Sequence, residues 1–259
     1  YGSYVASDAL GGNVGFYPEI LNNFLAHSVP DMQWLWNLLD FTGITKGLCD
    51  FVNGITEKYK TEIYHGTMRD NFGTMPGMWA MMQTDEYDAA KEFVFGDDAA
   101  EYKGVIERID KFQNFRKTRD EFIKQMQADG VIVAIVTAYG SPVTPVYDRA
   151  YVDGDVVLES ELMSAGATIA PYGKDLGEDY VAADPAKLSP DRKIDASTCL
   201  LPDNTWFIKD APHVPCNYGS DIAEMLFWLI SADTQPTVTT NELYPQFQYT
   251  DAQQNLYHF

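Results

Sequence analysis

Basic residues are scarce in this chain. Lysine and arginine number 18 against 38 aspartates and glutamates, which gives a formal net charge of −20 at pH 7 over 259 residues. Because such a surface repels phosphate groups, we expect no nucleic-acid partner and no simple electrostatic docking on anionic lipid. The hydrophobic fraction of 46% and the aromatic fraction of 14% nevertheless predict a packed globular protein rather than a disordered one.

Cysteine and histidine are also rare, which weakens any metal or disulfide hypothesis. The three cysteines, Cys49, Cys199 and Cys216, are odd in number and include no Cys-x-x-Cys, so a disulfide framework is not expected. A single bridge between Cys199 and Cys216 and two buried thiols both stay open. The four histidines lack metal-ligand spacing, and no glycine-rich phosphate loop follows a strand, so we expect no metal ion and no cofactor.

Long apolar runs are missing as well. No run reaches about 18 residues, the length that a membrane-spanning helix needs, so we expect no transmembrane segment. The chain opens on Tyr1-Gly2-Ser3-Tyr4, without an initiator methionine and without the basic and apolar regions of a signal peptide. We therefore expect the sequence to begin inside a longer protein.

The first half of the chain has the apolar spacing of helices. Residues 1–16 are rich in Gly, Ser and Ala and are predicted to form a loop. Residues 17–128 are predicted to form a helical block, because apolar and aromatic side chains recur every three or four residues. Within it, residues 68–82 are unusually rich in methionine, and residues 99–128 resemble two polar amphipathic helices.

The pattern changes at Gly130. Val131–Val136 is a continuous, mostly β-branched apolar run, typical of a strand buried on both faces. A second short strand is predicted at 205–208 and a closing amphipathic helix at 220–231. We therefore predict an α/β protein, with a core over residues 129–235 and an extended tail over residues 236–259.

Two polar residues follow the predicted strands, and together they suggest catalysis. Asp153 lies in a loop after the first strand, and His213 lies in a loop directly after the second. The α/β-hydrolases carry the acid and the base of a Ser…Asp…His triad in this order. Taken alone, Asp153-Gly154 is a common hairpin turn, and a loop histidine is usually a surface residue. The catalytic hypothesis therefore depends on their combination with the strands and the helix.

The third member of such a triad is not found in the chain. The nucleophile usually occupies a Gly-x-Ser-x-Gly turn between a strand and a helix, and no such motif occurs here. Ser141 is the nearest imitation, but Pro142 follows it and has no backbone N–H for an oxyanion hole. We therefore expect an N-terminal segment of the same protein, outside this sequence, to supply the serine, and we expect the chain alone to be inactive.

Several short segments resemble the lecithin:cholesterol acyltransferase-like group of α/β-hydrolases. Residues 139–145, Tyr-Gly-Ser-Pro-Val-Thr-Pro, resemble the Tyr-Gly-x-x-x-Pro-like loop of that family. Residues 153–160, Asp-Gly-Asp-Val-Val-Leu-Glu-Ser, resemble the Gly-Asp-Gly-Thr-Val-Pro-Leu-like stretch with the triad acid, although Asp155 replaces Thr, Val157 replaces Pro and Val152 replaces the first Gly. The register favours Asp153 as the acid and leaves Asp155 as the alternative. Residues 72–82 are similar to a stretch near the end of the family's cap.

The resemblance implies the C-terminal portion of an α/β-hydrolase sheet with a large inserted helical cap over residues 17–128. It also implies a serine hydrolase of the lipase, esterase or acyltransferase type that acts on acyl esters, with lipid as the expected substrate and a secreted location. Such a cap would receive acyl chains on aromatic and methionine side chains, namely Trp34, Trp36, Met75, Met78 and Trp79. For these residues the alternative is ordinary helical core packing. For the whole protein the alternatives are a non-catalytic binding or cell-surface module on a hydrolase-like scaffold, and an unrelated two-domain protein of helices and strands with Asp153 in an exposed hairpin.

Overall fold

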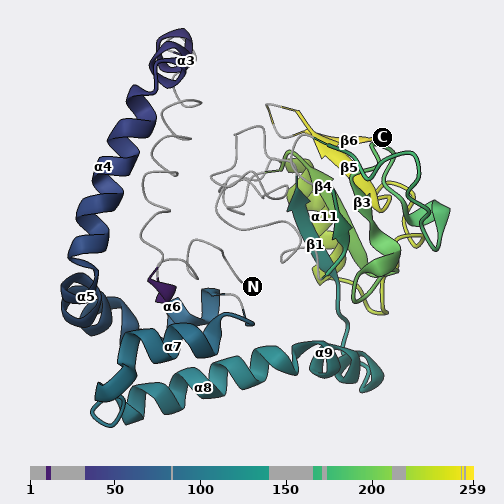
Figure 1. The fold of residues 1–259 in the computed structure, drawn as a ribbon. Coiled ribbons are helices and arrows are strands. Elements are labelled where there is room, and N and C mark those ends of the chain that lie inside the picture. The colour runs from purple at the N-terminus through teal and green to yellow at the C-terminus, as the bar shows by residue number, and fades with distance from the viewer. Residues whose placement is uncertain are drawn as a thin grey trace. The chain divides into compact units, whose positions relative to one another are not determined.

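Two compact units make up the chain, one over Tyr1–Thr118 and the other over Arg119–Phe259. The computed structural model describes residues 10–12, 33–82, 84–139, 166–170, 174–211, 220–251, 253 and 255–259. Within these ranges the protein has mixed α/β content, as the sequence predicts (Figure 1). No helix within them is both long enough and apolar enough to cross a membrane.

The described part of the first unit is helical throughout. Its elements are α3 (Gln33–Phe41), α4 (Ile44–Lys58), α5 (Lys60–Glu62), a π-helix (Ile63–Gly73), α6 (Pro76–Met81), α7 (Tyr87–Phe95), a 3-10 turn (Gly96–Asp98) and α8 (Lys103–Lys117). A helical block is the expectation for this part of the sequence, whereas the π-helix is not predicted. Gly43 separates α3 from α4 with φ 77°, a backbone conformation that side chains other than glycine rarely adopt.

The core of the first unit forms around Trp79. Its indole is stacked on Phe95, with ring centroids 5.6 Å apart, and meets Tyr87 edge to face. Trp79 Nε1 donates a hydrogen bond to the carbonyl of Gly73 at 2.8 Å, so the ring's one polar atom is satisfied inside the core. The other buried members of this cluster are Leu10, Met82, Ala90, Val94 and Ile109.

The second unit contains a four-stranded mixed sheet in the order β1-β4-β5-β6. Its strands are β1 (Ile135–Tyr139), β4 (Thr205–Lys209), β5 (Phe247–Thr250) and β6 (Leu256–His258), and a separate two-stranded sheet joins β2 (Thr168–Ile169) to β3 (Ile194–Asp195). β1, β4 and β5 run parallel, and β6 is antiparallel to β5. The described helices of this unit are α9 (Arg119–Ala128) and α11 (Ser220–Ile230), with 3-10 turns at Pro185–Lys187 and Ala196–Thr198.

Alternate residues of β4 face the two sides of the main sheet, because successive side chains of a strand point in opposite directions. Trp206 and Ile208 pack with Ile222 and Met225 of α11 on one face. Phe207 lies on the other face, in a cluster that also contains Tyr139, Ala167, Ile194, Ala196, Cys199 and Phe247. Both faces of β4 are therefore covered, which is the arrangement that a continuous apolar strand predicts.

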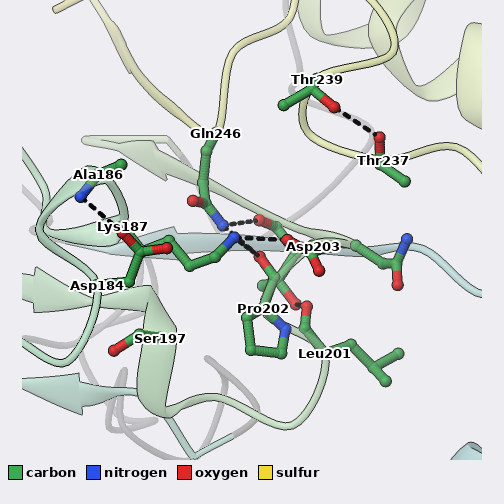
Figure 2. A network of polar contacts seen from close by, with 12 residues as sticks. Asp184, Ala186, Lys187, Ser197, Leu201, Pro202, Asp203, Thr237, Thr239 and Gln246 are labelled. Carbon is green, nitrogen blue, oxygen red and sulfur yellow. Dashed lines mark hydrogen bonds and ion pairs between the residues drawn. The ribbon is translucent and has the colours of Figure 1, made fainter.

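A polar network fixes the loop that leads into β4 (Figure 2). Lys187 Nζ contacts Asp203 Oδ1 at 2.6 Å and donates to the carbonyl of Pro202 at 3.4 Å. Gln246 Nε2 donates to the carbonyls of Pro202 at 2.7 Å and Thr205 at 3.0 Å, which ties this loop to the start of β5. The network joins the amino ends of β4 and β5 and thereby helps to fix the register of the two strands.

The C-terminal segment 236–259 and α9 are placed more specifically than the sequence indicates. The segment expected as an extended tail contributes β5 and β6 to the main sheet. α9 belongs to the same compact unit as the sheet, although the sequence analysis assigns it to the helical block. It ends at Ala128, and just beyond it the N–H groups of Gly130 and Val131 donate to the carbonyls of Gln127 and Met126 in a Schellman motif. This turn directs the chain towards β1.

Candidate functional site

The carboxyl edge of β1 and β4 is the candidate functional site. The two strands are adjacent and parallel, and their register pairs Tyr139 with Lys209 at the last position of each. One hydrogen bond joins the ends directly, from the N–H of Asp210 to the carbonyl of Tyr139 at 2.8 Å. The chain therefore leaves both strands at the same place, and ligands of open α/β sheets bind at such carboxyl edges.

The predicted triad residues lie outside the described residues. Asp153 and Asp155 belong to residues 140–165, which follow β1, and His213 belongs to residues 212–219, which follow Ala211. The strands that precede these two segments, β1 and β4, are described and are neighbours in one sheet.

A polar cluster that the sequence analysis does not predict lies at this edge. The carboxylate of Asp191 accepts a hydrogen bond from Ser189 Oγ at 2.7 Å and from Tyr139 OH at 3.4 Å. Lys209 Nζ lies 3.3 Å from the same carboxylate, and both side chains are largely shielded from solvent. Asp191 thus links the last residues of the two strands. No sequence signal identifies it, because it lies in a polar stretch without apolar periodicity.

Asp210 has an unusual backbone and an unusual carboxyl group. Its φ of 60° falls in the left-handed region, which aspartate tolerates better than most residues. Burial raises the pKa of its carboxyl above the usual value, and the charge of Asp191 acts in the same direction, whereas Lys209 and Lys193 act against it. A partly buried carboxylate therefore stands at the end of β4, close in sequence to His213.

The raised pKa of Asp210 predicts a specific pH dependence. Between the unfolded pKa and the higher folded pKa, the native state binds more protons, so stability falls as pH rises through that window. We expect Asp210→Asn to raise the urea midpoint at pH 7. At pH 3 we expect no change, because the protonated Asp210 side chain is neutral, as asparagine is. Asparagine also tolerates a positive φ, so the backbone is retained.

The exposed Glu178 provides the matched control for that measurement. Glu178→Gln removes one negative charge from the same acidic chain, so its effect on the midpoint measures general charge repulsion. If the urea midpoint at pH 7 rises equally in the two variants, burial of Asp210 does not destabilise the protein. Urea titrations of both variants at the two pH values make the comparison.

The five residues predicted to bind acyl chains are not alike in the structure. Trp79 is fully buried in the core of the first unit, and Met78 packs against that core as a partly buried neighbour. Met75 and Trp34 are exposed, with 52% and 67% of their surfaces accessible. Trp36 lies in α3, and its side chain is outside the description. Of the four whose side chains are described, Trp34 and Met75 are the most accessible to a ligand.

Cys199 is a free, buried thiol in the second unit. Burial raises the pKa of the thiol, and the hydrogen bond to Thr205 Oγ1 opposes that shift. A protonated buried thiol is a poor nucleophile, which gives Cys199 a packing role. Cys216 lies outside the described residues.

An apolar groove lies beside β1. It has a volume of about 350 Å³ and is lined by Ile132, Ala134, Val136, Leu226, Leu229, Ile230 and Ala232. Within the described sheet, β1 pairs only with β4, so β1 is an edge strand there. Val131–Tyr139 contains no charged residue and no proline, the devices that usually protect an edge strand from pairing.

In comparisons with known proteins, no family model, no curated protein and no solved structure matches this chain. Within the described ranges, no group of three or more His, Cys, Asp or Glu side chains is arranged to hold a metal ion.

Proposed function

We propose that the protein is a serine hydrolase of the lipase, esterase or acyltransferase type that acts on acyl esters of lipids. Its sheet would be the C-terminal portion of an α/β-hydrolase core, and its helical block would be the cap. The observation that supports this proposal is the pairing of β1 and β4. The segments with the proposed acid and base follow two neighbouring parallel strands at one edge.

The position of His213 in the sequence supports its role as the base. Only Pro212 separates it from Ala211, the last described residue after β4. Because two residues of chain span at most about 7 Å, this short connection supports a base at the carboxyl edge. The segment with Asp153 and Asp155 is long enough to form a loop that returns to the same edge.

In the proposed mechanism, His213 takes the proton of a serine hydroxyl as the serine attacks the ester carbonyl. It then returns the proton to the leaving alcohol. Asp153, or Asp155 in its place, accepts a hydrogen bond from the other ring nitrogen, which fixes the tautomer and stabilises the imidazolium. Water or an alcohol then removes the acyl group from the serine. The acceptor decides between hydrolase and acyltransferase activity.

The nucleophilic serine is proposed to come from a segment outside these 259 residues. The edge of β1, which has no second partner strand among the described residues, and the apolar groove beside it support this part of the proposal. A further parallel strand would pair with β1, and its side chains would cover the walls of the groove. The sheet would thereby extend towards the missing member of the triad.

Labelling with a fluorophosphonate probe tests the proposal on the full-length gene product. The probe reacts covalently with an activated serine, and peptide mass spectrometry locates the modified residue. We expect one labelled serine, outside the 259 residues, in a Gly-x-Ser-x-Gly turn, and no labelling after heat denaturation. Modification of Ser141 would reject the external nucleophile, and an unlabelled folded protein would favour the non-catalytic module.

A further inference from the structure

The helix α4 exposes an apolar stripe. Its members follow one another at helical spacing and are all exposed, and we call Ile44, Leu48, Phe51 and Ile55 the α4 stripe. Phe51 has 65% of its surface accessible. The preceding helix α3 adds Trp34, Leu38 and Phe41, of which Phe41 is 89% accessible. Contiguous exposed apolar surface of this kind usually marks an interaction site.

Three uncharged polar residues of α4 are less exposed than its apolar stripe, while its charged residues are exposed. Thr45 is buried, and Asn53 and Thr56 are less exposed than the stripe. The hydroxyl of Thr56 donates to the carbonyls of Val52 and Asn53 within the helix, each at 3.0 Å. An ordinary surface helix buries its apolar side and exposes its polar side. α4 departs from that pattern, because its apolar stripe is exposed to solvent together with its charged residues.

The charge of this segment is unlike that of the rest of the chain. Residues 33–60 contain three acidic side chains, Asp40, Asp50 and Glu57, and three basic ones, Lys46, Lys58 and Lys60, so their net charge is zero. The whole chain has a net charge of −20. Lys46 and Asp50 also pair within α4 at 2.8 Å. The apolar surface therefore lies in a locally neutral region of a strongly acidic protein.

We propose that the α4 stripe docks on an uncharged lipid surface, such as zwitterionic phospholipid or aggregated acyl ester. This inference rests on the proposed function, for which it supplies the route to an insoluble substrate. Apolar and aromatic side chains enter the interface between headgroups and acyl chains, and the helix lies in its plane. The neutral segment incurs no repulsion from such a surface, whereas the acidic chain as a whole is repelled by anionic lipid.

A second copy of the chain is a less suitable occupant of the stripe. Two molecules that each have a net charge of −20 repel one another, and that repulsion opposes a dimer. An uncharged lipid surface adds no opposing charge. The experiment below includes the oligomeric state, so a dimer through α4 would be detected.

Vesicle flotation tests the docking surface without any catalytic turnover. The full-length protein is mixed with phosphatidylcholine vesicles, or with phosphatidylglycerol vesicles for comparison, and the floated fraction is measured. We expect binding to phosphatidylcholine and weaker binding to phosphatidylglycerol. The double variant Leu48→Glu/Phe51→Glu is expected to bind phosphatidylcholine at least about tenfold more weakly. It places two charges where the apolar side chains would enter the lipid.

The matched control places the same two charges on exposed apolar residues of the other unit. Val181→Glu/Phe227→Glu changes residues that are 87% and 72% accessible, and it is expected to float like the wild type. Equal loss in both double variants, or no flotation of the wild type, would overturn the proposal. So would sedimentation of the wild type as a dimer that Leu48→Glu/Phe51→Glu dissociates. Hydrolysis of a soluble short-chain ester, measured separately, reports on the proposed function and not on docking.

Discussion

Replacement of His213 by alanine in the full-length gene product is expected to reduce kcat/KM for a p-nitrophenyl acyl ester by about 10³-fold or more, the scale of loss for a triad base. The carboxyl ends of β1 and β4 give the physical reason, since they bring the segments of the proposed acid and base to one edge. In the proposed mechanism, this substitution removes the group that takes the serine proton. Steady-state hydrolysis of a soluble ester measures the effect independently of lipid docking.

Two further variants decide which carboxylate is the acid. Asp153→Asn is expected to lower kcat/KM by about 10³-fold, because asparagine favours the wrong tautomer of the histidine, and Asp155→Asn is expected to have little effect. The reverse result would assign Asp155 as the acid. Activity of His213→Ala at the wild-type level would reject the triad altogether. Unchanged thermal unfolding of each variant shows that an activity loss is not a loss of folding.

The parts of the fold that were predictable from sequence are those in which apolar periodicity and burial coincide. The closing helix is expected at 220–231 and is observed at Ser220–Ile230, and the short strand expected at 205–208 is β4 at Thr205–Lys209. Both segments bury an apolar set against the same cluster. The α/β class follows from these elements together with the helical first half.

The strand at β1 shows where the apolar pattern misplaces an element. The sequence predicts it over Val131–Val136, but pairing begins at Ile135, whose N–H donates to the carbonyl of Asn204 at 2.9 Å. Earlier in the run, the backbone of Val133 is bonded to the side chain of Gln235 instead of to a strand. Hydrophobicity therefore locates the buried segment, whereas the partners of its backbone decide where the strand starts.

The strand β5 is not predicted from the sequence, because some of its buried residues are polar. Gln248 is fully buried, and Thr250 is nearly so, although both residue types are usually exposed. Gln248 Nε2 donates to the carbonyl of Pro245 at 2.9 Å, and Thr250 Oγ1 donates to the carbonyl of Lys209 at 3.3 Å. The bond of Thr250 joins residues that are distant in sequence, whereas that of Gln248 is local. Asp191, which reaches Tyr139 and Lys209 at the candidate site, was unpredictable for the same reason.

Replacement of Trp79 by alanine is expected to destabilise the first unit by about 3–5 kcal/mol, as for other buried aromatic side chains cut back to alanine. The indole is fully buried, stacked on Phe95, and bonded to the carbonyl of Gly73, so its removal leaves a cavity and an unsatisfied acceptor. The same contacts support a packing role for Trp79 over the predicted acyl-binding role. Hydrogen-exchange protection of the amides in α6, α7 and α8 measures the loss within this unit.

Trp34 provides the matched control, because it is also a tryptophan of the helical block but is 67% accessible. Trp34→Ala is expected to change stability by no more than about 0.5 kcal/mol, since an exposed side chain loses few contacts. If the α4 stripe and the adjacent exposed residues of α3 meet lipid together, Trp34→Ala weakens flotation while leaving exchange protection intact. If Trp79→Ala kept full exchange protection but lost ester hydrolysis, a substrate-binding role for Trp79 would be favoured instead. The two tryptophans thus separate the packing and binding contributions of one aromatic-rich block.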